Sequence, residues 1–190
     1  MTEAKPVRVA VVYGGRSSEH SVSCISAGAI MAHLDPAKYE VLPIGITQDG
    51  TWTQGTREGL DIVDGRLPEV ELQDELALSL NPSTRGRIHN VTRHEHYAEV
   101  DVIMPVLHGP FGEDGTVQGL FELSGIPYVG AGVLASAAGM DKEFAKKLLV
   151  AEGLPVAPQV VLSGETTLEK EQKERLGLPV FVKPCLLYTS

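Results

Sequence analysis

An apolar run at residues 7–13, VRVAVVY, constrains the fold of this chain more than any other stretch. The run is rich in β-branched residues and almost uninterrupted, which is typical of a strand that is covered on both faces. Gly14 and Gly15 end it, a helical pattern follows up to about His33, and a second strand is expected at residues 39–46. The order strand, glycine turn, helix, strand predicts a right-handed parallel unit, and therefore an α/β fold.

The start of the predicted helix carries polar residues that suit a helix N-terminus. We expect Ser17 or Ser18 to cap the helix, and the charge of Glu19 suits its positive end. His20 is expected to be structural or exposed.

The rest of the chain alternates between regular and irregular stretches. Residues 53–97 mix short apolar pieces with Gly, Pro and charged residues, and we expect an insertion of short hairpins or a small helix there. Further strands are expected at residues 100–107, 126–130, 159–162 and 179–183, and helices at residues 116–124 and 135–152. We expect one domain at residues 1–140 and the start of a second at residues 141–190.

The composition argues against several classes of protein. The chain has 190 residues, enough for one domain and part of a second. Its net charge is −9 and its longest basic stretch is Lys146-Lys147, so we expect no nucleic-acid partner. The two cysteines form no CxxC pair and suggest neither zinc nor a disulfide. The N-terminus lacks an apolar signal core and no run approaches the roughly 20 apolar residues of a membrane span, so we expect a cytoplasmic protein without a membrane partner.

Two loops with glycines, residues 14–20 and 108–115, follow predicted strands at the edge where open α/β sheets bind ligands. Glu19 and Glu113 supply carboxylates and His108 supplies an imidazole, a mixture that suits a small zwitterion. Taken singly, each of these residues also has a structural explanation as a helix cap, part of a surface turn or a histidine bonded to a carbonyl. The glycine spacing matches neither GxGxxG nor GxxxxGK[ST], so a dinucleotide-binding oxidoreductase is the least favoured interpretation.

Taken together, the loops and their flanking residues resemble the D-alanine–D-alanine ligase family. The matching stretches occur in the family's order and cover nearly all of the chain outside the insertion and the last residues. They are VYGGRSSEHSVS (12–23), LHGPFGEDGTVQG (107–119), IPYVG (126–130), SAAGMDK (136–142) and FVKP (181–184). The insertion at residues 53–97 is similar to that of the larger ligases of the family.

The resemblance implies an ATP-grasp enzyme, with a Rossmann-like parallel sheet at residues 1–140 and an incomplete ATP-grasp α+β lobe from residue 141 onward. In such enzymes the carboxylate of one D-alanine attacks the γ-phosphate of ATP and becomes an acyl phosphate. The amine of a second D-alanine then displaces phosphate, which gives the dipeptide of the peptidoglycan precursor. The resemblance also implies Mg²⁺ as a cofactor and a homodimer formed through the N-terminal domain.

Site residues follow from the same resemblance where the motifs match. Glu19 corresponds to the catalytic glutamate that binds the ammonium group of the first D-alanine. His108 corresponds to the histidine beside the substrate. Glu113 corresponds to the glutamate of the same substrate-binding loop, on the nucleotide side or in a supporting role. Lys142 and Lys183 correspond to lysines that contact the phosphates of ATP, although in most chains such lysines are simply solvated.

The end of the sequence departs from the family pattern. After Lys183-Pro184 the family continues with a glycine- and serine-rich loop, whereas this chain has CLLYTS at residues 185–190. We expect that this tail is foreign to the family, that the metal ligands lie further along in the family, and that this chain alone does not catalyse ligation. Two alternatives stay open. One is a D-alanine–D-lactate or D-alanine–D-serine ligase, and the other is a non-catalytic module that binds an amino acid or dimerises.

Overall fold

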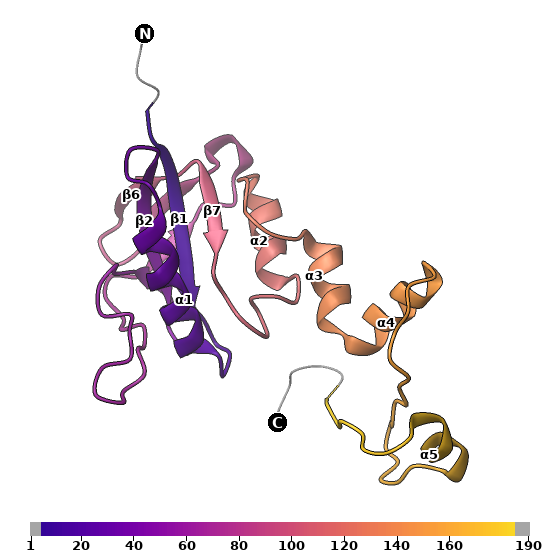
Figure 1. Ribbon diagram of the computed structural model, residues 1–190. Helices are drawn as coiled ribbons and strands as arrows, with labels where there is room; N and C mark the ends of the chain where they lie inside the picture. The colour runs from indigo at the N-terminus through magenta and orange to yellow at the C-terminus, as the bar shows by residue number, and fades with distance from the viewer. Residues whose placement is uncertain (1–4, 185–190) are drawn as a thin grey trace. The chain divides into compact units, whose positions relative to one another are not determined.

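The computed structural model describes residues 5–184 (Figure 1). The chain divides into two compact units, Met1–Ser136 and Ala137–Ser190, and each is described by itself. The tail that departs from the family pattern, residues 185–190, lies outside the described residues. Within residues 5–184, none of the helices is long and apolar enough to cross a membrane.

The first unit is built on a sheet with the strand order β3-β2-β1-β7. β1 (Val7–Gly14) lies between β2 (Tyr39–Ile46) and β7 (Val102–Pro105) and is parallel to both. β3 (Trp52–Gln54) follows β2 after a short turn, so it pairs with β2 in the antiparallel direction. The expected α/β fold is confirmed, but the sheet is mixed where a parallel sheet was expected.

The insertion contains short hairpins, as expected. Its elements are β4 (Leu76–Leu78), η1 (Pro82–Thr84), β5 (Arg87–Asn90) and β6 (Glu95–Glu99). The three strands form a separate antiparallel sheet, which we call the small sheet. Leu76 and Ile88 of the small sheet are buried in one core together with residues of β1 and β2, so the insertion covers one face of the main sheet.

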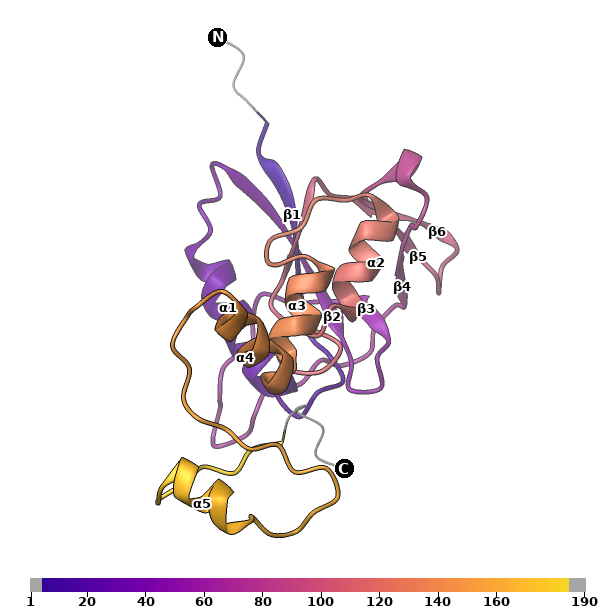
Figure 2. The same cartoon turned by 90° about the vertical axis from the view of Figure 1, so that its right-hand side faces the viewer.

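Neighbouring residues of β1 point to opposite faces of the main sheet, as the pleat requires. Val11 and Tyr13 are buried in a core that includes residues of α1 (His20–His33). Val12 is buried in the other core, which includes residues of α2 (Thr116–Ser124). Figure 2 shows α1 on one side of the sheet and α2 with the small sheet on the other. Burial on both faces explains why the β1 sequence is almost continuously apolar.

The second unit differs most from the expectations. The single helix expected at residues 135–152 is two helices, α3 (Val133–Met140), which crosses the division between the units, and α4 (Lys142–Ala151). Asp141 separates them because its Oδ1 accepts hydrogen bonds from the backbone N–H groups of Glu143 and Phe144, at 2.9 and 3.1 Å. This cap starts a new helix at a residue that the sequence-based interpretation placed inside one.

The strands expected at residues 159–162 and 179–183 are wrong. The second unit contains α5 (Lys170–Leu176), but its described residues form no strand. An extended apolar run becomes a strand only when a neighbouring strand satisfies its backbone groups, and no such neighbour is present among these residues. The strand expected at residues 126–130 is reduced to a single bridge to β7, because Pro127 has no N–H to donate.

Candidate functional site

The first loop leaves β1 through two glycines in a left-handed backbone conformation. Gly14 and Gly15 have φ angles of +90° and +95°. A side chain on Gly14 would collide with the carbonyl oxygen of Ile46, the last residue of β2. The Gly15 N–H donates to that same oxygen at 2.8 Å. Only glycine allows so close an approach, and the turn therefore fixes the loop at the carboxyl edge of the sheet.

His20 is a structural residue, with only 2% of its surface exposed. Its Nε2 accepts a hydrogen bond from the Val70 N–H at 3.0 Å, so Nδ1 carries the proton and donates to the Gly15 carbonyl at 2.7 Å. This imidazole therefore links the first loop to the insertion.

Glu19 occupies the N-cap position of α1, so the expectation that Ser17 or Ser18 caps the helix is wrong. The Ser17 hydroxyl instead accepts a hydrogen bond from the Glu19 N–H at 3.0 Å, which closes a turn just before the helix. The Glu19 side chain makes no cap hydrogen bond. A Cβ added to Gly109 would lie 2.8 Å from Glu19 Oε2, so the carboxylate lies directly beside the second loop.

The second loop is held by its own acidic side chains. Glu113 Oε2 accepts a hydrogen bond from the Gly109 N–H at 2.7 Å. The two oxygens of Asp114 accept from the N–H groups of Phe111 and Thr116, at 2.8 and 3.0 Å. Burial alone would raise the pKa of Asp114, but these hydrogen bonds outweigh it and hold the pKa below its usual range. The loop is therefore shaped by charged acceptors that do not depend on a ligand.

A glutamine on α2 holds the same loop by a hydrogen bond to its backbone. Gln118 is buried, and its Nε2 donates to the Gly112 carbonyl at 2.9 Å. Its Oε1 is buried without a hydrogen-bond partner. The sequence motif contains Gln118, but nothing in its spacing indicates a contact with a glycine of the preceding loop.

Two serines on α1 contact residues at the start of both loops. These serines were not among the residues expected from the sequence. Ser23 Oγ is fully buried, accepts a hydrogen bond from the Gly14 N–H at 2.8 Å and donates to the Val106 carbonyl. Ser26 Oγ lies 3.3 Å from His108 Nε2. The available signal was a pair of serines three residues apart on a helix that also buries Cys24, Ala27 and Met31.

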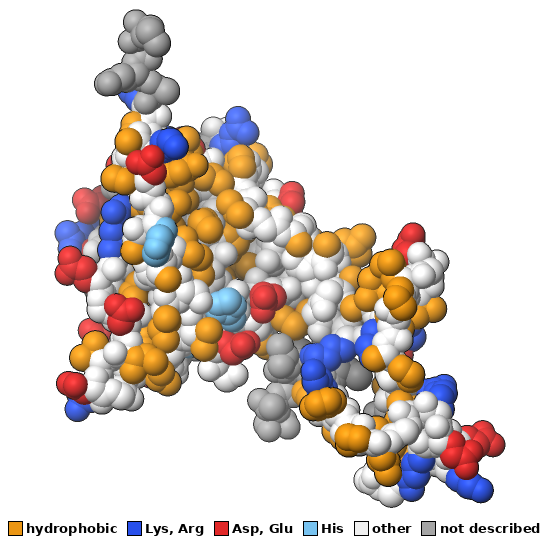
Figure 3. All heavy atoms as spheres, in the orientation of Figure 1, with side chains coloured by type: hydrophobic (Ala, Val, Ile, Leu, Met, Phe, Trp, Pro, Cys, Tyr) orange, Lys and Arg blue, Asp and Glu red, His pale blue; other side chains and the backbone are white. Residues whose placement is uncertain are grey.

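The predicted site residues fall into two groups. Glu19, His108 and Glu113 come together at one edge of the first unit, while Lys142 and Lys183 belong to the second unit. Figure 3 shows a histidine next to carboxylates on the surface over the loop that follows β7. In the part of the chain that the structure describes, no group of three or more His, Cys, Asp or Glu side chains is arranged to hold a metal ion.

The chemistry of this edge suits the ammonium group of a small ligand. Glu19 and Glu113 both lie against the backbone of Gly109. Glu113 accepts a hydrogen bond from the Gly109 N–H, and Glu19 Oε2 lies where a side chain of residue 109 would begin. The Glu113 carboxylate is used to hold the loop, whereas the Glu19 carboxylate makes no cap hydrogen bond and is half-exposed. A half-exposed carboxylate at the carboxyl edge of parallel strands is well placed to accept hydrogen bonds from an amino group.

Comparisons with known proteins agree with this geometry. Residues 8–131 match the family described as "D-ala D-ala ligase N-terminus". A D-alanine–D-alanine ligase of Corynebacterium aurimucosum is 89% identical over 185 residues, which are 97% of this chain and 52% of that protein. The chain thus spans about half the length of the curated relatives it matches.

Solved structures of ligases share the fold. The VanG D-Ala:D-Ser ligase of Enterococcus faecalis is 37% identical with a TM-score of 0.67, over 81% of this chain and 44% of that one. A D-alanine–D-alanine ligase of Bacillus anthracis, solved in complex with ATP, is 31% identical with a TM-score of 0.60, over 94% of this chain and 47% of that one. On the family match over residues 8–131 and the identity to its relatives, the chain belongs to the D-alanine–D-alanine ligase family.

Proposed function

We propose that the first unit is the amino-acid-binding part of an ATP-dependent ligase that joins two D-alanines into D-alanyl-D-alanine through an acyl phosphate, for peptidoglycan precursor synthesis. The observation that carries the proposal is the position of the Glu19 carboxylate beside Gly109, where the two loops meet. In this proposal Glu19 binds the ammonium group of the first D-alanine, His108 lies beside that substrate, and Glu113 orients the loop.

In the proposal the second unit helps to bind ATP. Residues 1–140 form the substrate-binding domain, and residues 141–190 begin the ATP-grasp domain. In the proposal Lys142 and Lys183 contact the phosphates of ATP. Lysine suits this role because its ammonium group acts as a point charge that attracts phosphate. The likeness to a relative solved with ATP supports this role. In this proposal Mg²⁺ is a cofactor, and its ligands lie further along the enzyme. We also propose a cytoplasmic homodimer with no nucleic-acid or membrane partner.

Calorimetric titration of the purified chain tests the amino-acid site. D-alanine is expected to bind, whereas D-lactate, which has a hydroxyl in place of the amine, is expected not to. Glu19→Gln removes a hydrogen bond to a charged group and is expected to weaken D-alanine binding by about ten- to a hundredfold. Glu40→Gln, at the opposite end of β2, is the matched control and is expected to bind like the original chain. Equal affinities in the two variants would remove Glu19 from the site.

A second experiment tests whether the chain alone catalyses ligation. Incubation with D-alanine, ATP and Mg²⁺ is expected to give no dipeptide, because the proposal places the metal ligands further along the enzyme. Dipeptide formation with phosphate release beyond one equivalent would show that these residues suffice.

A second candidate is a ligase that uses D-serine or D-lactate as the second substrate. The likeness to a D-Ala:D-Ser ligase favours D-serine over D-lactate. Competition between D-alanine, D-serine and D-lactate as acceptors, measured by product composition with the full-length enzyme, distinguishes these candidates.

A further inference from the structure

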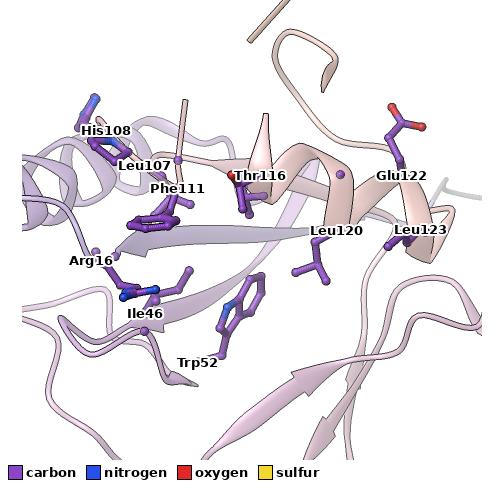
Figure 4. Close-up of a pocket in the computed structure, with 17 residues that line it drawn as sticks. Arg16, Ile46, Trp52, Leu107, His108, Phe111, Thr116, Leu120, Glu122 and Leu123 are labelled. Atoms are coloured by element: carbon purple, nitrogen blue, oxygen red, sulfur yellow. The ribbon is translucent and has the colours of Figure 1, made fainter. Parts of the chain in front are cut away.

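An open cavity of about 800 Å³ lies between α2 and the ends of β1 and β2 (Figure 4). Its volume is within the range of pockets that bind small molecules, and its walls are mainly apolar. The large side chains of the wall are Ile46, Trp52, Leu107, Phe111, Leu120 and Leu123. His108 lines the cavity whereas Glu19 and Glu113 do not, so the cavity borders the proposed substrate site at His108 without including its two carboxylates.

Part of the wall is held in place before any ligand arrives. The ring of Trp52 packs edge-on against Phe121, which is fully buried, with 6.5 Å between the ring centroids. Ile46 is buried at the end of β2, and Leu107 is buried in the loop that follows β7. These fixed side chains require little reordering on binding, which favours affinity.

Arg16 provides the positive charge in the wall. Its guanidinium carbon lies 4.5 Å from the centroid of the Phe111 ring, so the two loops meet in a cation–π contact. Figure 4 shows the guanidinium beneath the Phe111 ring, on the side that faces Trp52. Within residues 5–184 the Arg16 guanidinium makes no hydrogen bond or ion pair with another side chain.

Within residues 5–184 the acidic residue of the wall forms no ion pair with Arg16. Glu122 is the acidic lining residue, but its carboxylate accepts a hydrogen bond from the Tyr128 hydroxyl at 2.8 Å. In Figure 4 that carboxylate points away from Trp52 and Leu120. The cavity therefore offers an apolar floor and one oriented guanidinium, which suits a planar anionic group such as a carboxylate.

We propose that this cavity binds a small organic anion with a flat apolar body, of the aromatic carboxylate or sulfonate class, with the anionic group on Arg16 and the apolar body against Trp52 and Leu120. This inference goes beyond the proposed ligase function and does not depend on it.

Two probes with the same rings separate the charge from the apolar contact. The sulfonate 8-anilinonaphthalene-1-sulfonate and its uncharged analogue N-phenyl-1-naphthylamine are titrated into the purified chain. Trp52 is the single tryptophan of the sequence, so the NMR signal of its indole N–H reports binding at the wall directly. Both probes are expected to shift this signal, and the sulfonate is expected to bind more tightly.

Variants of Arg16 test the assigned charge. Arg16→Gln is expected to weaken the sulfonate by about tenfold or more and to leave the uncharged probe unchanged. Arg16→Lys keeps the charge and is expected to restore most of the sulfonate affinity. Equal sulfonate affinity in Arg16→Gln and the original chain would overturn the proposal.

A filled cavity gives the second test. A Cβ on Gly119, which lines the cavity from α2, would meet no atom within 4 Å, so a side chain can leave the helix at this position and Gly119→Leu adds bulk at the cavity wall. This variant is expected to lose both probes, whereas the matched change Gly139→Leu in α3, where a Cβ also has open space, is expected to lose neither. An unmoved Trp52 signal would overturn the proposal. A dimer in sedimentation whose formation excludes the probes would also overturn it, and would assign this surface to a second copy of the chain.

Discussion

Replacing Ser23 with alanine removes the side chain that joins the roots of both loops. The Ser23 hydroxyl is fully buried, accepts from the Gly14 N–H at 2.8 Å and donates to the Val106 carbonyl. Each buried group left without a partner costs about 1–3 kcal/mol, so the loss of both hydrogen bonds predicts a destabilisation of about 2–6 kcal/mol. This is a large fraction of the roughly 5–15 kcal/mol that stabilises a typical folded chain.

Equilibrium unfolding in urea, followed by the fluorescence of Trp52, measures this loss. Ser21→Ala on the same helix is the matched control, because the Ser21 hydroxyl makes no hydrogen bond within residues 5–184, and we expect a change of at most about 0.5 kcal/mol. Ser23→Cys keeps a weak donor and acceptor in nearly the same space and is expected to fall between the two. If Ser23→Ala unfolds at the same urea concentration as Ser21→Ala, the serine does not connect the loops as described.

Three further changes probe the loops and the core. Asp114→Asn is expected to lower the free energy of unfolding at neutral pH by about 0.5–2 kcal/mol. The pKa of Asp114 is lower in the folded chain than in the unfolded chain, so its stabilisation is present above the unfolded pKa of about 3.9. This stabilisation is lost as the pH falls through the folded pKa. Urea titrations at acidic pH are therefore expected to show a smaller difference in the free energy of unfolding between the variant and the original chain. Gly109→Ala places a side chain at φ +71°, against Glu19 Oε2, and is expected to weaken D-alanine binding by about tenfold in calorimetry. Burial raises the pKa of Cys24 to about 11, so in a Cys185→Ser background the folded chain is expected to react with a thiol reagent at pH 8 only after urea is added, and rapid reaction without urea would contradict the burial.

The main sheet could be predicted from the sequence because its signals are local. The strand at residues 39–46 and the helix at residues 116–124 have the bounds that were expected, and β1 is one residue longer than its apolar run. These segments have a clear apolar period and end at glycines or polar residues, so local sequence determines where they stop.

The elements that were wrong depend on partners that a local pattern does not contain. The break at Asp141 results from a side chain that caps the following helix, although the apolar pattern continues across it. The run at residues 179–183 is apolar enough for a strand, but in the described part of the second unit no strand lies beside it. The direction of β3 depends on the short connection after β2, which the expectation of a parallel sheet did not take into account.

In the candidate site, too, local features were predicted and contacts between distant elements were not. Glu19, His108 and Glu113 were expected from the two loops, and the structure places them together. The hydrogen bonds of Ser23, Ser26 and Gln118 were not expected, because residues that hold a loop from another element leave no signal in a single sequence. The role of Glu19 is tested by the binding experiments, and the roles of the other four predicted residues are proposals.

NMR titration of the ¹⁵N-labelled chain with D-alanine shows whether the two loops form one amino-acid site. We expect the amide signals of residues 15–20 and 108–113 to move together with one dissociation constant, and Glu19→Gln to suppress both sets of shifts. Shifts confined to one loop, or shifts that Glu19→Gln leaves unchanged, would contradict a shared site.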